Sequence, residues 1–188
     1  MEYRSLTEKN LLITGRPAVG KTTLIKKISL ALGDLEPVGF YTAEIKEGGV
    51  RKGFELISLD GRKQMLSHQN LGTPDRVGKY RVDVGGFEDF LESIPFFSPS
   101  SQVTILDEIG KMECLSVRFR RLLIDLLDSK KVVLATIGIK GTGFMETLRA
   151  RRDIKLFEIT EGNRDFLVFE VLKEVETAAA RFSAGRKR

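Results

Sequence analysis

Apolar residues along the chain alternate between short continuous runs and stretches with helical spacing. The run 11–14 predicts a strand, and apolar positions three to four residues apart in 20–32 predict a helix that ends at Gly33. The same alternation returns after residue 102, with strands expected at 103–106, 132–136 and 155–159 and helices at 117–127, 143–151 and 165–180. Strands that alternate with helices predict parallel βα units.

The segment 38–68 has a different pattern. Three strand-like stretches are separated by Gly48-Gly49 and Asp60-Gly61, which are turn pairs typical of antiparallel hairpins. A loop at 69–78, a short helix at 84–92 and a proline-containing loop at 94–101 follow. We therefore expect an α/β fold in three layers: a mostly parallel sheet, helices on both faces, and an antiparallel hairpin region near one edge.

A length of 188 residues favours one domain, which we place at 1–180, with a basic and disordered tail at 181–188. The chain has one cysteine, 41% hydrophobic residues and no apolar run long enough to cross a bilayer. The first ten residues contain no apolar signal core. These features predict a cytoplasmic, monomeric protein without a membrane partner.

The net charge of +5 raises the question of a nucleic-acid partner. Four basic and no acidic residues lie within 181–188, so the rest of the chain carries a net charge of only +1. The charge balance therefore does not favour nucleic-acid binding by the folded body, although it leaves such binding open for the tail.

One segment, Gly15–Thr22, matches the phosphate-loop pattern G-x-x-x-x-G-K-[ST] in full and lies between a predicted strand and a predicted helix. Backbone N–H groups of such a loop converge on the β- and γ-phosphates. The lysine neutralises phosphate charge and the threonine hydroxyl binds Mg²⁺. We expect the nucleotide to be bound by Gly15, Arg16, Pro17, Ala18, Val19, Gly20, Lys21, Thr22 and Thr23.

Two adjacent carboxylates, Asp107 and Glu108, follow the apolar run 103–106. In a phosphate-loop fold, Asp107 at the strand tip would hold Mg²⁺, and Glu108 would act as a general base on a water facing the γ-phosphate. The stretch also fits the D-x-x-G pattern of GTPase switch regions. However, Glu161-Gly-Asn-Arg-Asp165 does not match the guanine-reading motif N-K-x-D.

Taken together, these motifs make the chain resemble the THEP-type, or cancer-related, nucleoside triphosphatase family. The resemblance extends from Leu11 to about Val175, and its landmarks in order are ITGRPAVGKTTL, GFYTAEI, GGVRKGF, LDGR, GKYRVDV, ILDEIGKME, ATI and ITEGNRD. It implies a RecA-like core and Mg²⁺-dependent hydrolysis of ATP, GTP and other nucleoside triphosphates to diphosphates. It also implies the base role for Glu108 and phosphate or metal roles for Lys21, Thr22 and Asp107.

One departure from the family pattern lies inside the phosphate loop. The family usually has glycine where this chain has Ala18, and a Cβ there is costly only if the backbone φ is positive. We expect a modest change in loop geometry or affinity.

An additional positive charge would stabilise the γ-phosphoryl transition state. The candidates are Arg16, Arg120, Arg121 and Arg164. Arg164 is the preferred nucleotide contact because the last βα loop of such sheets lies near the base. Asn163, which is also the expected N-cap of the last helix, and Glu161 are further base-side candidates.

Two other functions remain open from the residues alone. A small-molecule or nucleoside kinase would use Asp107 or Glu108 to activate an acceptor hydroxyl. A nucleotide-gated nucleic-acid-binding protein would use hydrolysis to reset a bound state, with phosphate contacts from the tail and a steep salt dependence.

Overall fold

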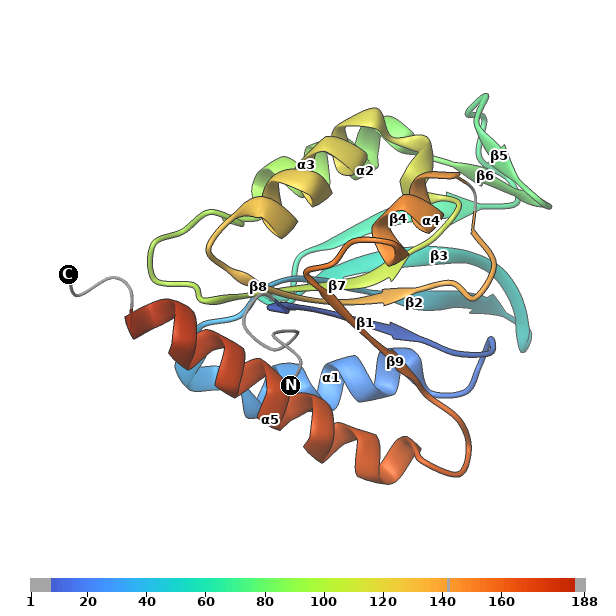
Figure 1. Ribbon diagram of the computed structural model, residues 1–188. Helices are drawn as coiled ribbons and strands as arrows, with labels where there is room; N and C mark the ends of the chain where they lie inside the picture. Colours follow the sequence, from blue (N-terminus) through green and yellow to red (C-terminus); the bar gives the residue numbers. More distant parts are fainter. Residues whose placement is uncertain (1–7, 142, 185–188) are drawn as a thin grey trace.

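The computed structural model describes residues 8–141 and 143–184 and contains one nine-stranded sheet (Figure 1). The strands are β1 (Asn10–Thr14), β2 (Val38–Glu47), β3 (Val50–Ser58), β4 (Lys63–His68), β5 (Arg76–Val77), β6 (Tyr80–Val82), β7 (Val103–Ile109), β8 (Val132–Ile137) and β9 (Ile154–Glu158). The α-helices are α1 (Lys21–Ala31), α2 (Val84–Ser93), α3 (Val117–Asp128), α4 (Gly143–Arg149) and α5 (Arg164–Ala184). Two short 3₁₀ helices are η2 (Gly33–Leu35) and η3 (Glu113–Leu115).

The sheet order is β5-β6-β4-β3-β2-β7-β8-β1-β9. The pairings among β2, β7, β8, β1 and β9 are parallel, and those among β2, β3, β4, β6 and β5 are antiparallel. The antiparallel region at one edge is therefore confirmed, but it supplies half of the pairings, so the sheet is less parallel than expected. The carboxyl ends of the five parallel strands lie at one edge of the sheet, where α/β folds bind ligands.

Helices cover both faces of the sheet, as predicted. α1 and α5 pack on one face, and α2, α3 and α4 cover the other (Figure 1). Successive residues of the buried parallel strands point to opposite faces, which explains their continuous apolar runs. In β1, for example, Ile13 packs into the core under α1 and α5, whereas Leu12 packs into the core under α2 and α3.

Three elements differ from the sequence prediction. The expected loop at 69–78 contains β5, which pairs with β6 in a small hairpin. β7 continues to Ile109, so Asp107, which was expected at the tip of the strand, and Glu108 both lie within it. α5 continues to Ala184 instead of ending near Ala180, so the first part of the predicted tail is helical, and residues 185–188 lie outside the described residues. Within the described residues, no helix is long and apolar enough to span a membrane.

Candidate active site

The phosphate-loop segment connects β1 to α1 at the carboxyl edge of the parallel strands. α1 begins at Lys21, directly after Gly20, whose φ of 114° lies in the left-handed region. No side chain caps this helix, so the N–H groups of its first turn are available to a ligand. A helix start of this kind attracts phosphate through its N–H groups and its dipole.

At two positions in the loop, Gly15 and Ala18, the backbone geometry determines how well a Cβ atom is tolerated. A Cβ on Gly15 would lie 2.6 Å from both the carbonyl oxygen and Cγ2 of Ile159, so only glycine fits between β1 and the residue after β9. Ala18, where the family usually has glycine, has a φ of 62°. Its backbone is therefore in the positive-φ conformation, in which a Cβ atom is costly. An L-residue in this conformation costs about 1–2 kcal/mol.

The Lys21 side chain folds back over the loop. Its Nζ donates to the carbonyl oxygens of Gly15 at 3.0 Å and Arg16 at 3.1 Å. The ammonium group also lowers the pKa of Asp107 and Glu108 through its charge, although burial raises both more strongly. The structure thus brings the loop lysine and the acidic pair into one electrostatic environment.

Asp107 is fully buried and is held by threonine hydroxyls from three elements. Thr136 on β8 donates to Oδ1 at 2.6 Å, Thr42 on β2 lies 3.5 Å from Oδ2, and the Thr22 hydroxyl at the start of α1 also donates to this carboxylate. Burial raises the pKa of Asp107, and the Thr136 and Thr22 hydroxyls, a backbone hydrogen bond from Thr42 and the charge of Lys21 oppose the shift. Sequence reasoning missed Thr42 and Thr136, although a hydroxyl in an otherwise apolar strand such as VVLAT was an available signal.

The Thr22 hydroxyl and the Asp107 carboxylate together form a set of hard oxygen donors. Mg²⁺ prefers such ligands, and it typically takes one or two protein groups alongside substrate phosphates and water. Among the described residues, no three His, Cys, Asp or Glu side chains group as a metal-binding cluster. The residues present therefore fit a magnesium ion that is shared with a phosphate ligand.

The Glu108 side chain is half-buried at the ends of β7 and β8. The register between these strands shifts between Leu106 and Ile109, and an irregularity of this kind re-aims side chains at a strand end. Oε1 of Glu108 lies 3.9 Å from the position of a Cβ built on Gly138, just after β8. Burial and the charge of Asp107 raise the pKa of Glu108, which makes this carboxylate a stronger base.

A third carboxyl group, that of Glu113, lies beside the acidic pair. It begins η3, is 4% exposed, and has a pKa raised to about 8, first by burial and then by the charge of Glu108. Sequence reasoning assigned it no role, because a glutamate between Met112 and Cys114 carries no local signal of burial.

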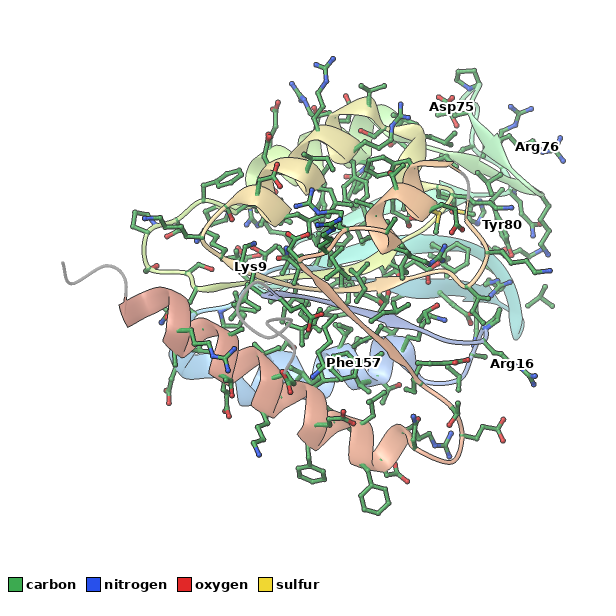
Figure 2. All side chains as sticks on the ribbon, in the orientation of Figure 1. Lys9, Arg16, Asp75, Arg76, Tyr80 and Phe157 are labelled. Atoms are coloured by element: carbon green, nitrogen blue, oxygen red, sulfur yellow. The ribbon has the colours of Figure 1, made fainter. Side chains whose placement is uncertain are left out.

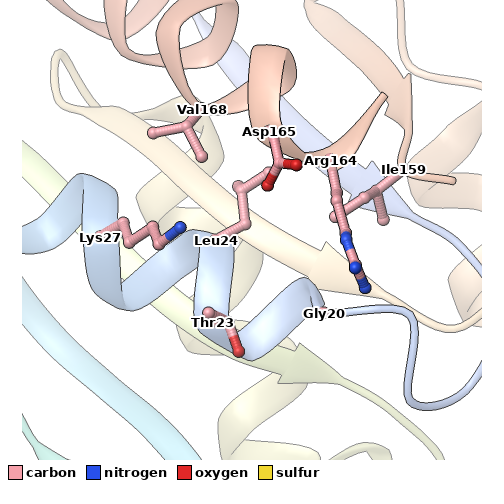
Figure 3. Close-up of a pocket in the computed structure, with 8 residues that line it drawn as sticks. All are labelled: Gly20, Thr23, Leu24, Lys27, Ile159, Arg164, Asp165 and Val168. Atoms are coloured by element: carbon pink, nitrogen blue, oxygen red, sulfur yellow. The ribbon is translucent and has the colours of Figure 1, made fainter. Parts of the chain in front are cut away.

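A pocket of about 230 Å³ lies beside the phosphate loop, between α1 and the start of α5 (Figure 3). It is lined by Gly20, Thr23, Leu24, Lys27, Ile159, Arg164, Asp165 and Val168. Three of the predicted nucleotide-binding residues, Gly20, Thr23 and Arg164, therefore meet at one cavity. Figure 3 shows the Arg164 side chain extending from α5 toward the Gly20 end of the loop.

The other base-side candidates are not brought into this pocket. Asn163 directly precedes α5, as predicted, but its side chain braces the preceding turn: Oδ1 accepts from the Thr160 N–H at 2.7 Å, and Nδ2 donates to the Glu158 carbonyl at 2.9 Å. It is therefore a turn-forming residue, and not the side-chain cap that its position suggested. Glu161 is exposed on the same turn.

The remaining arginine candidates do not line this pocket. Arg16 is exposed at the outer edge of the loop (Figure 2). Arg120 on α3 stacks over Phe144, with 6.0 Å between its guanidinium carbon and the ring centre, and Arg121 is exposed on the same helix. Of the four candidates, Arg164 alone lines the pocket.

With this geometry established, comparison with known proteins gives the family. A family model described as NTPase matches residues 10–172. The chain belongs to this nucleoside-triphosphatase family. The nucleoside-triphosphatase THEP1 of Thermotoga maritima is 43% identical over 178 residues, covering 94% of this chain and 98% of the relative. The human cancer-related nucleoside-triphosphatase is 36% identical over 188 residues, covering 90% and 98%.

Solved structures of this NTPase family share the fold. The crystal structure of THEP1 from the hyperthermophile Aquifex aeolicus matches with a TM-score of 0.77 and 35% identity, covering 89% of this chain and 99% of that chain. The solution structure of the human cancer-related nucleoside triphosphatase matches with a TM-score of 0.75 and 36% identity, covering 90% and 98%. The predicted P-loop NTPase fold and the predicted family are therefore confirmed.

Proposed function

We propose that this chain hydrolyses nucleoside triphosphates to diphosphates and phosphate in a Mg²⁺-dependent reaction. The observation that carries the proposal is the convergence of Lys21, Thr22 and Asp107, with Glu108 beside them. The phosphate loop, the Thr22 and Asp107 oxygens and the Glu108 carboxylate lie at one edge of the sheet, which supports the proposal. Family membership and the printed names of the relatives support the same activity.

Each residue has a separate task in this mechanism. The loop N–H groups and Lys21 bind the β- and γ-phosphates, while Thr22 and Asp107 hold the metal. Bound Mg²⁺ would neutralise charge that develops on the phosphate oxygens. Glu108 orients a water and accepts its proton as the water oxygen bonds to the γ-phosphorus and the bond to the β,γ-bridging oxygen breaks.

The pocket beside the loop supports broad base specificity. Its walls are partly aliphatic, from Leu24, Ile159 and Val168, and its polar members include the long, flexible side chains of Lys27 and Arg164. Apolar walls discriminate only weakly between ligands of similar shape, whereas fixed buried hydrogen-bonding groups discriminate strongly. We place the base here and expect ATP and GTP to be accepted alongside other triphosphates.

A phosphate-release assay with the four common triphosphates and their diphosphates, with and without Mg²⁺, tests the proposal. We expect phosphate from all four triphosphates only when the metal is present, and none from the diphosphates. Formation of diphosphate and a phosphorylated acceptor without free phosphate, and only when an acceptor hydroxyl is added, would indicate the kinase alternative instead.

Two variants separate binding from chemistry in this assay. Glu108→Gln should bind nucleotide as tightly as the parent chain but lose most turnover, and Lys21→Ala should lose affinity as well. Unchanged turnover in Glu108→Gln would refute the assignment of Glu108 as the base.

A further inference from the structure

The carboxyl group of Glu113 is buried without a charged partner among the described residues. It is 4% exposed, and within the described part of the chain no lysine, arginine or histidine forms an ion pair with it. Burying an unpaired carboxyl group is costly, and the raised pKa of about 8 reflects that cost. The contacts of this carboxyl group indicate what it does in the fold.

Gly110 lies between this carboxyl group and that of Glu108. A Cβ built on Gly110 would lie 2.6 Å from Oε2 of Glu113 and 3.0 Å from Oε1 of Glu108. The two oxygens therefore approach Gly110 from the same side and flank a space the size of a methyl group. The negative charge of Glu108 is also the second cause, after burial, of the raised pKa of Glu113.

The backbone around Gly110 is fixed by the same side chain. The Glu113 carboxyl group accepts hydrogen bonds from the N–H groups of Gly110 and of Glu113 itself. The Cys114 N–H closes the turn by donating to the Gly110 carbonyl oxygen at 3.1 Å. Gly110 is two residues after Glu108, so this turn determines the direction in which β7 leaves the site.

We propose that Glu113 is a positioning residue for hydrolysis, because its carboxyl group fixes Gly110 and limits where the Glu108 carboxylate lies. Glu113 acts through Glu108 and does not contact the nucleotide. The proposal rests on the proposed function, since it requires Glu108 to orient the attacking water. A displacement of a catalytic group by about 1 Å can lower the rate about 100-fold.

The first test compares Glu113→Ala with Glu113→Gln. We expect the alanine variant to lower kcat by about 10- to 100-fold, as for a misplaced catalytic group, with the affinity for ADP within about twofold of the parent chain. The glutamine variant keeps an acceptor oxygen for the Gly110 N–H and should recover most of kcat. A folded alanine variant with unchanged kcat, or a glutamine variant as slow as the alanine variant, would overturn the proposal.

Glu88→Ala is the matched control. Glu88 on α2 accepts a 2.7 Å hydrogen bond from Ser116, the cap of α3, and so braces the far end of the same segment without contacting Glu108. It should leave kcat unchanged. A loss of kcat equal to that in Glu113→Ala would show that any loosening of residues 110–116 has this effect, and would overturn a specific role for Glu113.

A double-mutant cycle separates this proposal from the proposed function. In a Glu108→Gln background, Glu113→Ala should cause no further loss of kcat, because the group through which it acts is already removed. An undiminished further loss would overturn the proposal for Glu113. Unchanged turnover in Glu108→Gln alone would instead refute the proposed role of Glu108.

Discussion

Thr136 on β8 donates a 2.6 Å hydrogen bond to Oδ1 of Asp107 on the neighbouring strand β7. Both side chains are fully buried, so neither can exchange this bond for one to water. The bond opposes the rise in the pKa of Asp107 that burial causes, and it leaves Oδ2 to face Thr42. Thr136 therefore holds the buried carboxylate in a fixed orientation and favours its charged form.

Removing this hydroxyl should weaken metal binding. Thr136→Val has nearly the same shape but cannot donate, so we expect the Mg²⁺ concentration for half-maximal activity to rise about 10-fold or more, as for other groups that orient metal ligands. A Mg²⁺ titration of phosphate release measures this. Thr104→Val on β7 is the control, because the buried Thr104 hydroxyl has no hydrogen-bond partner among the described residues. An unchanged Mg²⁺ requirement in Thr136→Val would contradict the prediction.

The left-handed backbone of Ala18 predicts that glycine is better tolerated there than alanine. Ala18→Gly should raise the free energy of unfolding by about 0.5–1 kcal/mol, because relief of strain outweighs the added freedom of the unfolded chain. Ala180→Gly, at an exposed position within α5, should lower it by about 1 kcal/mol. Urea unfolding of both variants checks the opposite signs, and a destabilised Ala18→Gly would show that the loop is not strained at this residue.

The raised pKa of Glu113 predicts how stability changes with pH. The folded chain keeps this proton up to a pKa of about 8, whereas the unfolded chain releases it near the ordinary value of 4.5. The folded state therefore binds more protons between these values, and its stability falls as the pH rises through this range. Glu113→Gln should flatten that decline, as measured by urea midpoints at several pH values between 5 and 9.

Asp60→Asn serves as the control for this experiment. The Arg62 guanidinium lowers the pKa of Asp60 to about 2, so the contribution of Asp60 changes only in more acidic solution. It should leave the slope between pH 5 and 9 unaltered. A Glu113→Gln slope identical to that of the parent chain would mean that Glu113 is not held protonated by the fold.

Arg164 offers a test of where the nucleotide lies. Within the described residues, no hydrogen bond or ion pair engages its guanidinium group, which lines the pocket beside Gly20. Arg164→Ala should raise KM about 3- to 10-fold at low ionic strength, because a cation facing the nucleotide is lost. Arg121→Ala, an exposed change on α3, should not alter KM.

Comparison across triphosphates locates the contact of Arg164. An equal effect on all four would place the guanidinium at the phosphates or ribose, and unequal effects would place it at the base. If KM were unchanged for all four, Arg164 would have no part in binding.

The parts of the site that the sequence predicts are those encoded within one continuous segment. The loop Gly15–Thr22 and the pair Asp107-Glu108 each directly follow an apolar run in the sequence. Because both runs form parallel strands of one sheet, the two segments come to the same edge of that sheet. Thr42, Thr136 and Glu113 escaped prediction because their roles come from burial against other elements. The local pattern of a single threonine or glutamate does not reveal which neighbours will surround it.

Some predicted ends of strands and helices differ from the structure for a related reason. Acidic residues are poor strand formers, so β7 was expected to stop before Asp107, but pairing with β8 continues to Ile109. Asn163 was placed correctly before α5, yet its side chain bonds backward to Glu158 and Thr160, and sequence does not distinguish the two directions. Of the four arginines, Arg164 is favoured by its place in the last βα loop, and the three-dimensional arrangement adds that it alone lines the pocket.

Because β8 lies between β1 and β7, it sets the distance between the phosphate loop and the acidic pair. Adjacent strands lie about 4.8 Å apart, so one intervening strand separates the strand that leads into the phosphate loop from the acidic strand by about 10 Å. This distance accommodates a terminal phosphate with a metal ion and a water.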